Sequence, residues 1–132
     1  MLALRWLIVL ACAGIVITAC GGKPKRVAVT EPSKVIHGYA TWYGGGHHGG
    51  PTASGERYNK RALTAAHRTL PMNTRVRVTN TRNGKSVILR INDRGPYGKR
   101  RERIIDVSER AAEILGMVEA GVVPITLEVL DR

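Results

Sequence analysis

Polar and apolar residues alternate along much of the chain after residue 34, and this alternation predicts strands. In residues 74–80 (TRVRVTN) the apolar and polar positions alternate with a period of two, which is the period of a half-buried strand. Residues 85–91 (KSVILRI) predict the next strand, and the intervening 81–84 (TRNG) contains Asn-Gly, a strong hairpin signal. The continuous apolar run at 87–89 predicts that this second strand is buried on both faces, as inside a small barrel.

Further strands are predicted on either side of this hairpin. Residues 35–43, 104–107 and 122–130 are rich in β-branched or aromatic residues. A short helix is expected after the second of these segments, because Ser108 suits an N-cap and Gly116 suits the residue that ends a helix. The pattern therefore predicts a mainly β domain, a small closed barrel with one or two short helices.

A long segment between the first strand and the hairpin has no clear strand period. Residues 44–51 (GGGHHGGP) contain too much glycine for regular structure and suit a loop that approaches a ligand. Residues 52–56 (TASGE) predict a turn, and 62–67 (ALTAAH) form a short apolar run of undecided type.

The N-terminus has the pattern of an exported protein. Arg5 precedes an apolar stretch at 6–17, which is shorter than the roughly 20 residues of a membrane span. The stretch ends in Ile-Thr-Ala-Cys-Gly and resembles the lipobox of bacterial lipoproteins, in which cleavage precedes a cysteine that is then acylated. We therefore expect a signal peptide over 1–19, a lipid anchor on Cys20 and a tether over 20–34. The alternative is cleavage elsewhere, with Cys20 incidental.

The anchor determines the expected compartment and the cysteine chemistry. Glycine at position 21 implies sorting to the outer membrane, facing the periplasm, or to the cell membrane where only one membrane is present. Cys12 would leave with the signal peptide and Cys20 would carry lipid. A domain over 35–132 would then have neither a disulfide nor a cysteine-based zinc site.

The formal net charge is +11, from 21 Lys and Arg against 10 Asp and Glu. An exported lipoprotein rarely meets nucleic acid, so we expect anionic envelope partners such as lipid head groups, teichoic-type polymers or peptidoglycan peptides. Lys99, Arg100, Arg101 and Arg103 indicate a local basic patch in one loop. The alternative is an ordinary solvated surface.

One carboxylate is presented at the end of a predicted strand. The hydrophobic run at 87–91 leads to Asn92 and Asp93. These two residues are followed by Arg94 and a Gly-Pro turn. A rigid strand ending in this way can aim an acid at a substrate. The alternative is an aspartate that bonds its own backbone to begin a turn.

Four segments of the chain form an ordered set: 38–44 (GYATWYG), 52–56 (TASGE), 62–71 (ALTAAHRTLP) and 91–96 (INDRGP). In this order and spacing they resemble the rare lipoprotein A (RlpA) family of septal-ring lytic transglycosylases. The similarity continues through 104–108 (IIDVS) and 115–117 (LGM). The resemblance implies a six-stranded double-psi β-barrel shared with expansins, an envelope location and peptidoglycan glycan as substrate.

The implied reaction is non-hydrolytic cleavage of the glycan after N-acetylmuramic acid, by endolytic or exolytic action. It yields a 1,6-anhydro product and makes the protein a carbon–oxygen lyase without a cofactor. One carboxyl group can serve as acid and then as base, because the first step prepares it for the second. The resemblance assigns this role to Asp93, and burial or a nearby carboxylate would have to hold its proton.

The resemblance assigns two further residues to the catalytic site. Glu56, in Ser-Gly-Glu, would hold the proton on Asp93 or stabilise oxocarbenium charge, and its alternative role is to tie down the loop. His67, in Ala-Ala-His, would bond a carboxylate or the substrate, and its alternative role is structural. Arg94 is expected to point away from Asp93 and to act on the sugar or the scaffold.

Candidate substrate-binding residues surround these positions. Strand alternation sends Trp42 and Tyr43 to opposite faces, and we expect Tyr43 in the groove, with Tyr97 as a second platform. The other candidates are Thr52, Ser54, Asn92 and Arg94. The adjacent His47 and His48 are poor chelators in a glycine loop, so no metal site is expected.

Two other function classes remain open. One is a non-catalytic, expansin-like module that binds or loosens the wall, and the other is a structural protein that bridges membrane and wall by charge. The family often adds a C-terminal SPOR domain, which we do not expect after Arg132. Septal targeting would then depend on cell-division proteins as partners, and the protein is expected to be a monomer.

Overall fold

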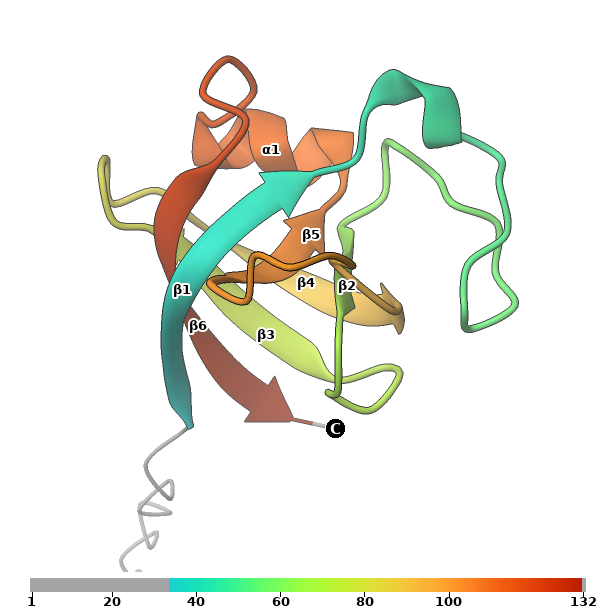
Figure 1. The fold of residues 1–132 in the computed structure, drawn as a ribbon, viewed down its shortest axis with the longest axis horizontal. Helices are drawn as coiled ribbons and strands as arrows, with labels where there is room; N and C mark the ends of the chain where they lie inside the picture. Colours follow the sequence, from blue (N-terminus) through green and yellow to red (C-terminus); the bar gives the residue numbers. More distant parts are fainter. Residues whose placement is uncertain (1–33, 132) are drawn as a thin grey trace, which may run out of the picture.

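The computed structural model describes residues 34–131, which fold into a closed six-stranded barrel (Figure 1). The strands are β1 (Val35–Trp42), β2 (Thr64–His67), β3 (Arg75–Asn80), β4 (Ser86–Asp93), β5 (Arg103–Val107) and β6 (Val123–Asp131). A 3₁₀ turn η1 (Gly45–His47) and a helix α1 (Glu109–Leu115) complete the fold. The expected mainly β, six-stranded barrel is confirmed. The expected signal peptide, Cys20 and nearly all of the tether lie outside the described residues.

The order of strands around the barrel is β1-β5-β2-β4-β3-β6. Two neighbouring pairs are parallel, β1 with β5 and β2 with β4, and the other pairs are antiparallel. The predicted hairpin is the β3–β4 pair, and the undecided segment at 62–67 contains β2. Strand β2 therefore lies between β4 and β5, where it brings their ends together.

The barrel interior is filled by aliphatic side chains from alternate strand positions. Val76, Val78, Leu89 and Ile91 are almost completely buried, and α1 closes one end with residues such as Leu115. The helix begins and ends as predicted. The Ser108 hydroxyl accepts a hydrogen bond from the Ala111 amide, and Gly116 takes the left-handed conformation.

Two local expectations were wrong. Ile88 is 42% exposed, so β4 is buried on one face only, because the outer face of the barrel meets solvent at this strand. The glycine-rich segment also contains regular structure, the single 3₁₀ turn η1. Among the described residues, no helix is long and apolar enough to cross a membrane.

Gly38 marks a close approach between two parts of the barrel. A Cβ atom at this position would lie 2.9 Å from three carbon atoms of the Ile104 side chain. We expect Gly38→Ala to lower the free energy of unfolding by about 1–3 kcal/mol through overpacking. Urea unfolding of this variant, of Ile104→Ala and of the double variant measures the effect. The double variant should be more stable than the sum of the two losses predicts, and simple additivity would contradict the steric explanation.

Candidate functional site

Asp93 ends β4 and joins three segments of the chain. Its Oδ2 accepts a hydrogen bond from the Tyr43 hydroxyl at 2.8 Å. Its Oδ1 accepts from the backbone amides of Ala53, at 2.9 Å, and of Arg94, at 2.8 Å. The hydrogen bond from the Arg94 amide is the local contact expected of an aspartate that begins a turn, but the other two donors come from distant loops. Three donors on one carboxylate fix its orientation.

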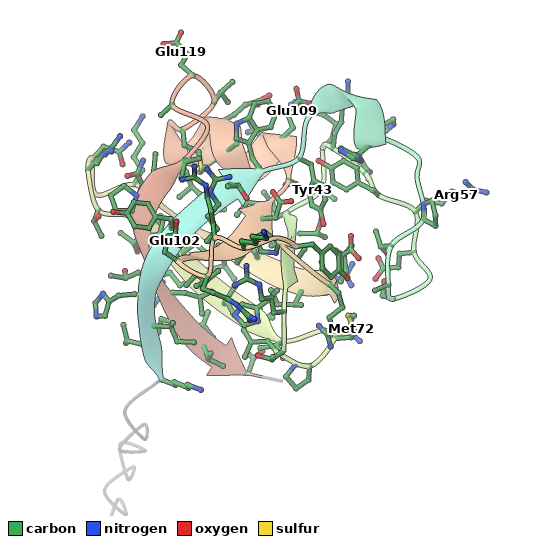
Figure 2. All side chains as sticks on the ribbon, in the orientation of Figure 1. Tyr43, Arg57, Met72, Glu102, Glu109 and Glu119 are labelled. Carbon is green, nitrogen blue, oxygen red and sulfur yellow. The ribbon has the colours of Figure 1, made fainter. Side chains whose placement is uncertain are left out.

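Tyr43 follows the end of β1 and lies against a small aromatic group (Figure 2). Its ring is 4.6 Å from that of Tyr58 and 5.8 Å from that of His47, measured between centroids. Burial, followed by the hydrogen bond to Asp93, raises the pKa of Tyr43 far above its usual value. The hydroxyl therefore keeps its proton and donates to Asp93, whereas a role as a sugar platform was expected for this residue.

Glu56 is held by an arginine and not by Asp93. Its two carboxylate oxygens accept from Arg90 Nη1 at 2.6 Å and Nη2 at 2.8 Å, and Ser54 Oγ donates to Oε1 at 3.3 Å. The hydrogen bonds from Arg90 are the largest cause that lowers the pKa of Glu56. None of the hydrogen bonds of Glu56 to residues 34–131 reaches Asp93. This geometry matches the alternative in which Glu56 ties the loop to the barrel.

The loop between η1 and β2 carries the other predicted ligands and lies over the end of β4. Thr52 Oγ1 donates to the Glu56 carbonyl at 2.7 Å and contacts Ser54 Oγ at 3.0 Å. The Ser54 amide donates to the carbonyl of Asn92, whose side chain is buried. Thr52, Ser54 and Asn92 thus hold the turn that supplies the Ala53 amide to Asp93.

His67 is buried at the end of β2 and bonds its own turn. Its Nδ1 accepts from the amides of Thr69 and Leu70, both at 3.1 Å. Burial is the main cause that lowers the pKa of His67 to about 4, and the positive charge of Arg94 is the second. The imidazole is therefore neutral at neutral pH. Its hydrogen bonds within the described part of the chain go to the backbone and not to Asp93 or Glu56.

Arg94 braces the same turn from the other side. Its Nη1 donates to the carbonyl of Leu70 at 2.7 Å and to that of His67 at 3.3 Å. The Arg94 guanidinium therefore contacts the scaffold, which is one of the two roles expected for it. The hydrogen bond from Arg94 to the Asp93 carboxylate comes from the backbone amide and not from the guanidinium.

Asp106 is a residue of this site that the sequence reasoning missed. It lies in β5 between the buried Ile105 and Val107, and its Oδ1 accepts from Thr41 Oγ1 at 3.2 Å. Burial is the main cause that raises the pKa of Asp106 to about 6. A polar residue inside the apolar run at 104–107 was the available signal, since strand alternation places it on the outer face.

A hollow of about 220 Å³ opens over Asp106. Its wall includes Thr41, Trp42, Pro96, Tyr97, Gly98, Lys99, Arg100 and Arg103. The ring of Tyr97 is 84% exposed there, as a sugar platform requires. The predicted basic loop therefore borders this hollow with three of its cations.

Arg68 holds the basic loop in place. Its guanidinium donates to the carbonyls of Pro96 at 2.8 Å and of Arg100 and Arg101 at 3.2 Å. Elsewhere, His48 Nδ1 accepts the Lys60 amide at 3.2 Å. Within residues 34–131, no group of three or more His, Cys, Asp or Glu is placed to hold a metal ion.

Similar proteins share this barrel. A family model described as lytic transglycolase matches residues 35–127. The chain is 55% identical over 111 residues to the probable endolytic peptidoglycan transglycosylase RlpA of Nostoc sp., covering 83% of this chain and 29% of that protein. It is 48% identical over 109 residues to the endolytic peptidoglycan transglycosylase RlpA of Campylobacter jejuni, covering 83% and 39%. The chain thus spans well under half of the length of these relatives.

Solved structures give the same architecture. The Streptomyces papain inhibitor aligns with a TM-score of 0.59 at 24% identity, covering 75% of this chain and 97% of that one. The expansin of Clavibacter michiganensis aligns with a TM-score of 0.58 at 24% identity, covering 75% and 52%. At this identity the likeness establishes the fold alone, a double-psi β-barrel. The family match over residues 35–127 and the identity to the RlpA proteins show that the chain belongs to the lytic transglycolase family.

Proposed function

We propose that this protein is a lytic transglycosylase that cleaves peptidoglycan glycan after N-acetylmuramic acid and leaves a 1,6-anhydro ring. The names of its relatives support this activity, and they favour endolytic over exolytic action. The observation that carries the proposal is the carboxylate of Asp93, which donors from three segments of the chain hold in one orientation.

The reaction requires two proton transfers. The C6 hydroxyl of the muramyl residue loses a proton as its oxygen attacks C1, and the leaving oxygen gains a proton as the C1–O bond breaks. A carboxylate that is held in a fixed direction can accept the first of these protons. We assign it to Asp93, with the neutral Tyr43 hydroxyl and two amides fixing its direction.

Glu56 and His67 take supporting roles in this proposal. The Glu56–Arg90 pair anchors the loop that carries the Ala53 amide. Arg94 donates a hydrogen bond to a carbonyl of the turn that follows His67. The exposed Tyr97 is proposed to stack on a sugar, and the basic loop to attract the anionic polymer.

We also propose a lipid-anchored envelope location, through Cys20, at the outer membrane or at the cell membrane of a cell with one membrane. The Ile-Thr-Ala-Cys-Gly sequence supports it. Incorporation of an alkyne-labelled palmitate into the wild type, but not into Cys20→Ser, is the expected result. Equal labelling of both proteins would contradict the anchor.

The activity is tested by incubating the purified protein with intact peptidoglycan and with peptidoglycan stripped of stem peptides by an amidase. Mass spectrometry should find new anhydromuramyl ends in at least one substrate, on internal fragments if the action is endolytic. Binding of glycan in a pull-down without new anhydro ends would contradict the enzyme and favour a non-catalytic wall-binding module.

A further inference from the structure

A second carboxyl group lies beside Asp93, on the next strand but one. Ala66 of β2 is paired with Asp93 of β4 on one side and with Asp106 of β5 on the other. Residues paired directly across neighbouring strands project from the same face of a sheet. Two strand spacings separate the Cα atoms of the two aspartates by roughly 10 Å, which leaves room for a glycosidic bond between their carboxyl groups.

That face is the outer one. Ala65, Ile91 and Ile105 belong to the core cluster inside the barrel, so their sequence neighbours Ala66 and Asp106 face outward. The residue between the two carboxyl groups is the buried Ala66, whose short side chain does not extend between the longer side chains of the two aspartates.

The two carboxyl groups have opposite surroundings. Asp93 accepts three hydrogen bonds, whereas the half-buried Asp106 accepts from the hydroxyl of Thr41, its one donor among the described residues. Burial, with a smaller contribution from the Asp93 charge, raises the pKa of Asp106 to about 6. Two neighbouring carboxyl groups in different surroundings are the usual basis of an acid and base pair.

Asp106 is also accessible to a substrate. It lines the hollow of about 220 Å³, together with Thr41 and the exposed Tyr97. A sugar stacked on Tyr97 would therefore lie over Asp106, the carboxyl group in the wall of this hollow.

We propose that Asp106 is a catalytic acid of this site and protonates the leaving oxygen, while Asp93 takes the proton of the C6 hydroxyl. This inference rests on the proposed function and completes its chemistry. The C6 oxygen forms a bond to C1 as the C1–O bond to the next sugar breaks. One proton passes from the C6 hydroxyl to Asp93 and another from Asp106 to the leaving oxygen. No water is consumed, and proton exchange with solvent then restores both groups.

A carboxyl group in this position opposes folding at neutral pH. The pKa of Asp106 is higher in the folded state than in the unfolded state. Its contribution to the free energy of unfolding is therefore fully present below about pH 4 and is lost as pH rises through about 6. The charged and titratable groups that act on it are Asp93, Tyr43, Tyr58 and His47, and the cations of the hollow are Lys99, Arg100 and Arg103. An asparagine would avoid this cost, so the aspartate is better explained by chemistry than by stability.

The test compares Asp106→Asn with the wild type on two substrates. On peptidoglycan glycan, the rate of anhydro product formation should fall by at least about 100-fold, the usual contribution of a general acid. On a muramyl glycoside with 4-nitrophenol as leaving group, which departs without protonation, the variant should keep most of the wild-type rate. Asp93→Asn should lose activity on both substrates.

Folding controls accompany these rates. The Tm of Asp106→Asn should exceed that of the wild type by several degrees at pH 8, where only the wild type carries a charge at this position. The two Tm values should match near pH 4, where Asp106 is protonated. Glu119→Gln, a carboxyl change at an exposed position between α1 and β6, should leave both rates unchanged.

Two results would overturn the assignment of Asp106. One is a wild-type rate for Asp106→Asn on glycan, and the other is an equal loss on glycan and on the nitrophenyl substrate. A wild-type protein that forms no anhydro product from any substrate would instead refute the proposed function. Carbon-13 NMR of the Asp106 carboxyl, titrating near pH 6 or near pH 4, would then decide whether the site holds a proton at all.

Discussion

Replacing Asp93 by asparagine is expected to reduce the formation of anhydro products by about 1000-fold or more, because the amide cannot take the C6 proton. The three donors around this position sharpen the expectation. The Tyr43 hydroxyl and two backbone amides all require an acceptor oxygen, and an amide group offers only one. At least one donor must therefore lose its partner, and the substitution affects both chemistry and geometry.

A matched control separates the two effects. Asp131→Asn removes the same charge from an exposed position on β6, where the partner is Arg75 at 3.1 Å. This variant should keep the wild-type rate. Thermal unfolding and circular dichroism should show that Asp93→Asn remains a folded barrel. A folded Asp93→Asn protein with the wild-type rate would contradict the role assigned to Asp93.

The elements with local signals were predictable from the sequence. The Asn-Gly turn gave the β3–β4 hairpin, and Ser108 and Gly116 gave both ends of α1. Strand β2 was not assigned because it has only four residues, all of them buried, and therefore shows no alternation. Its position between β4 and β5 is a property of barrel closure, which no local pattern encodes.

The site was predictable where one segment builds it and not where distant segments meet. The strand and Gly-Pro turn around Asp93 were visible in the chain as printed. Glu56 is paired with Arg90, which is 34 positions away in the chain. Because of this ion pair Glu56 anchors the loop, whereas the sequence alone suggested that it acts on Asp93. The relation of Asp106 to Asp93 depends on the register of β2 with both of its neighbours, so it needed the three-dimensional structure.

His67 should make the protein sensitive to acid over a defined range. Because its pKa is about 4 in the folded state and its ordinary value is 6.5, protonation favours unfolding. The stability it contributes is complete above about pH 6.5 and is lost as pH falls through about 4. The loss is on the order of 3 kcal/mol for a shift of this size.

Comparison with a variant is needed to observe this loss, because Asp106 contributes with the opposite sign in an overlapping range of pH. Urea unfolding of the wild type and of His67→Gln should show a stability difference that shrinks from pH 7 to pH 4, whereas the exposed His48→Gln should track the wild type. NMR titration of the His67 ring should give a midpoint near 4. A midpoint near 6.5 would mean that the imidazole is free to exchange protons at neutral pH, and it would return His67 to the catalytic role that the sequence suggested.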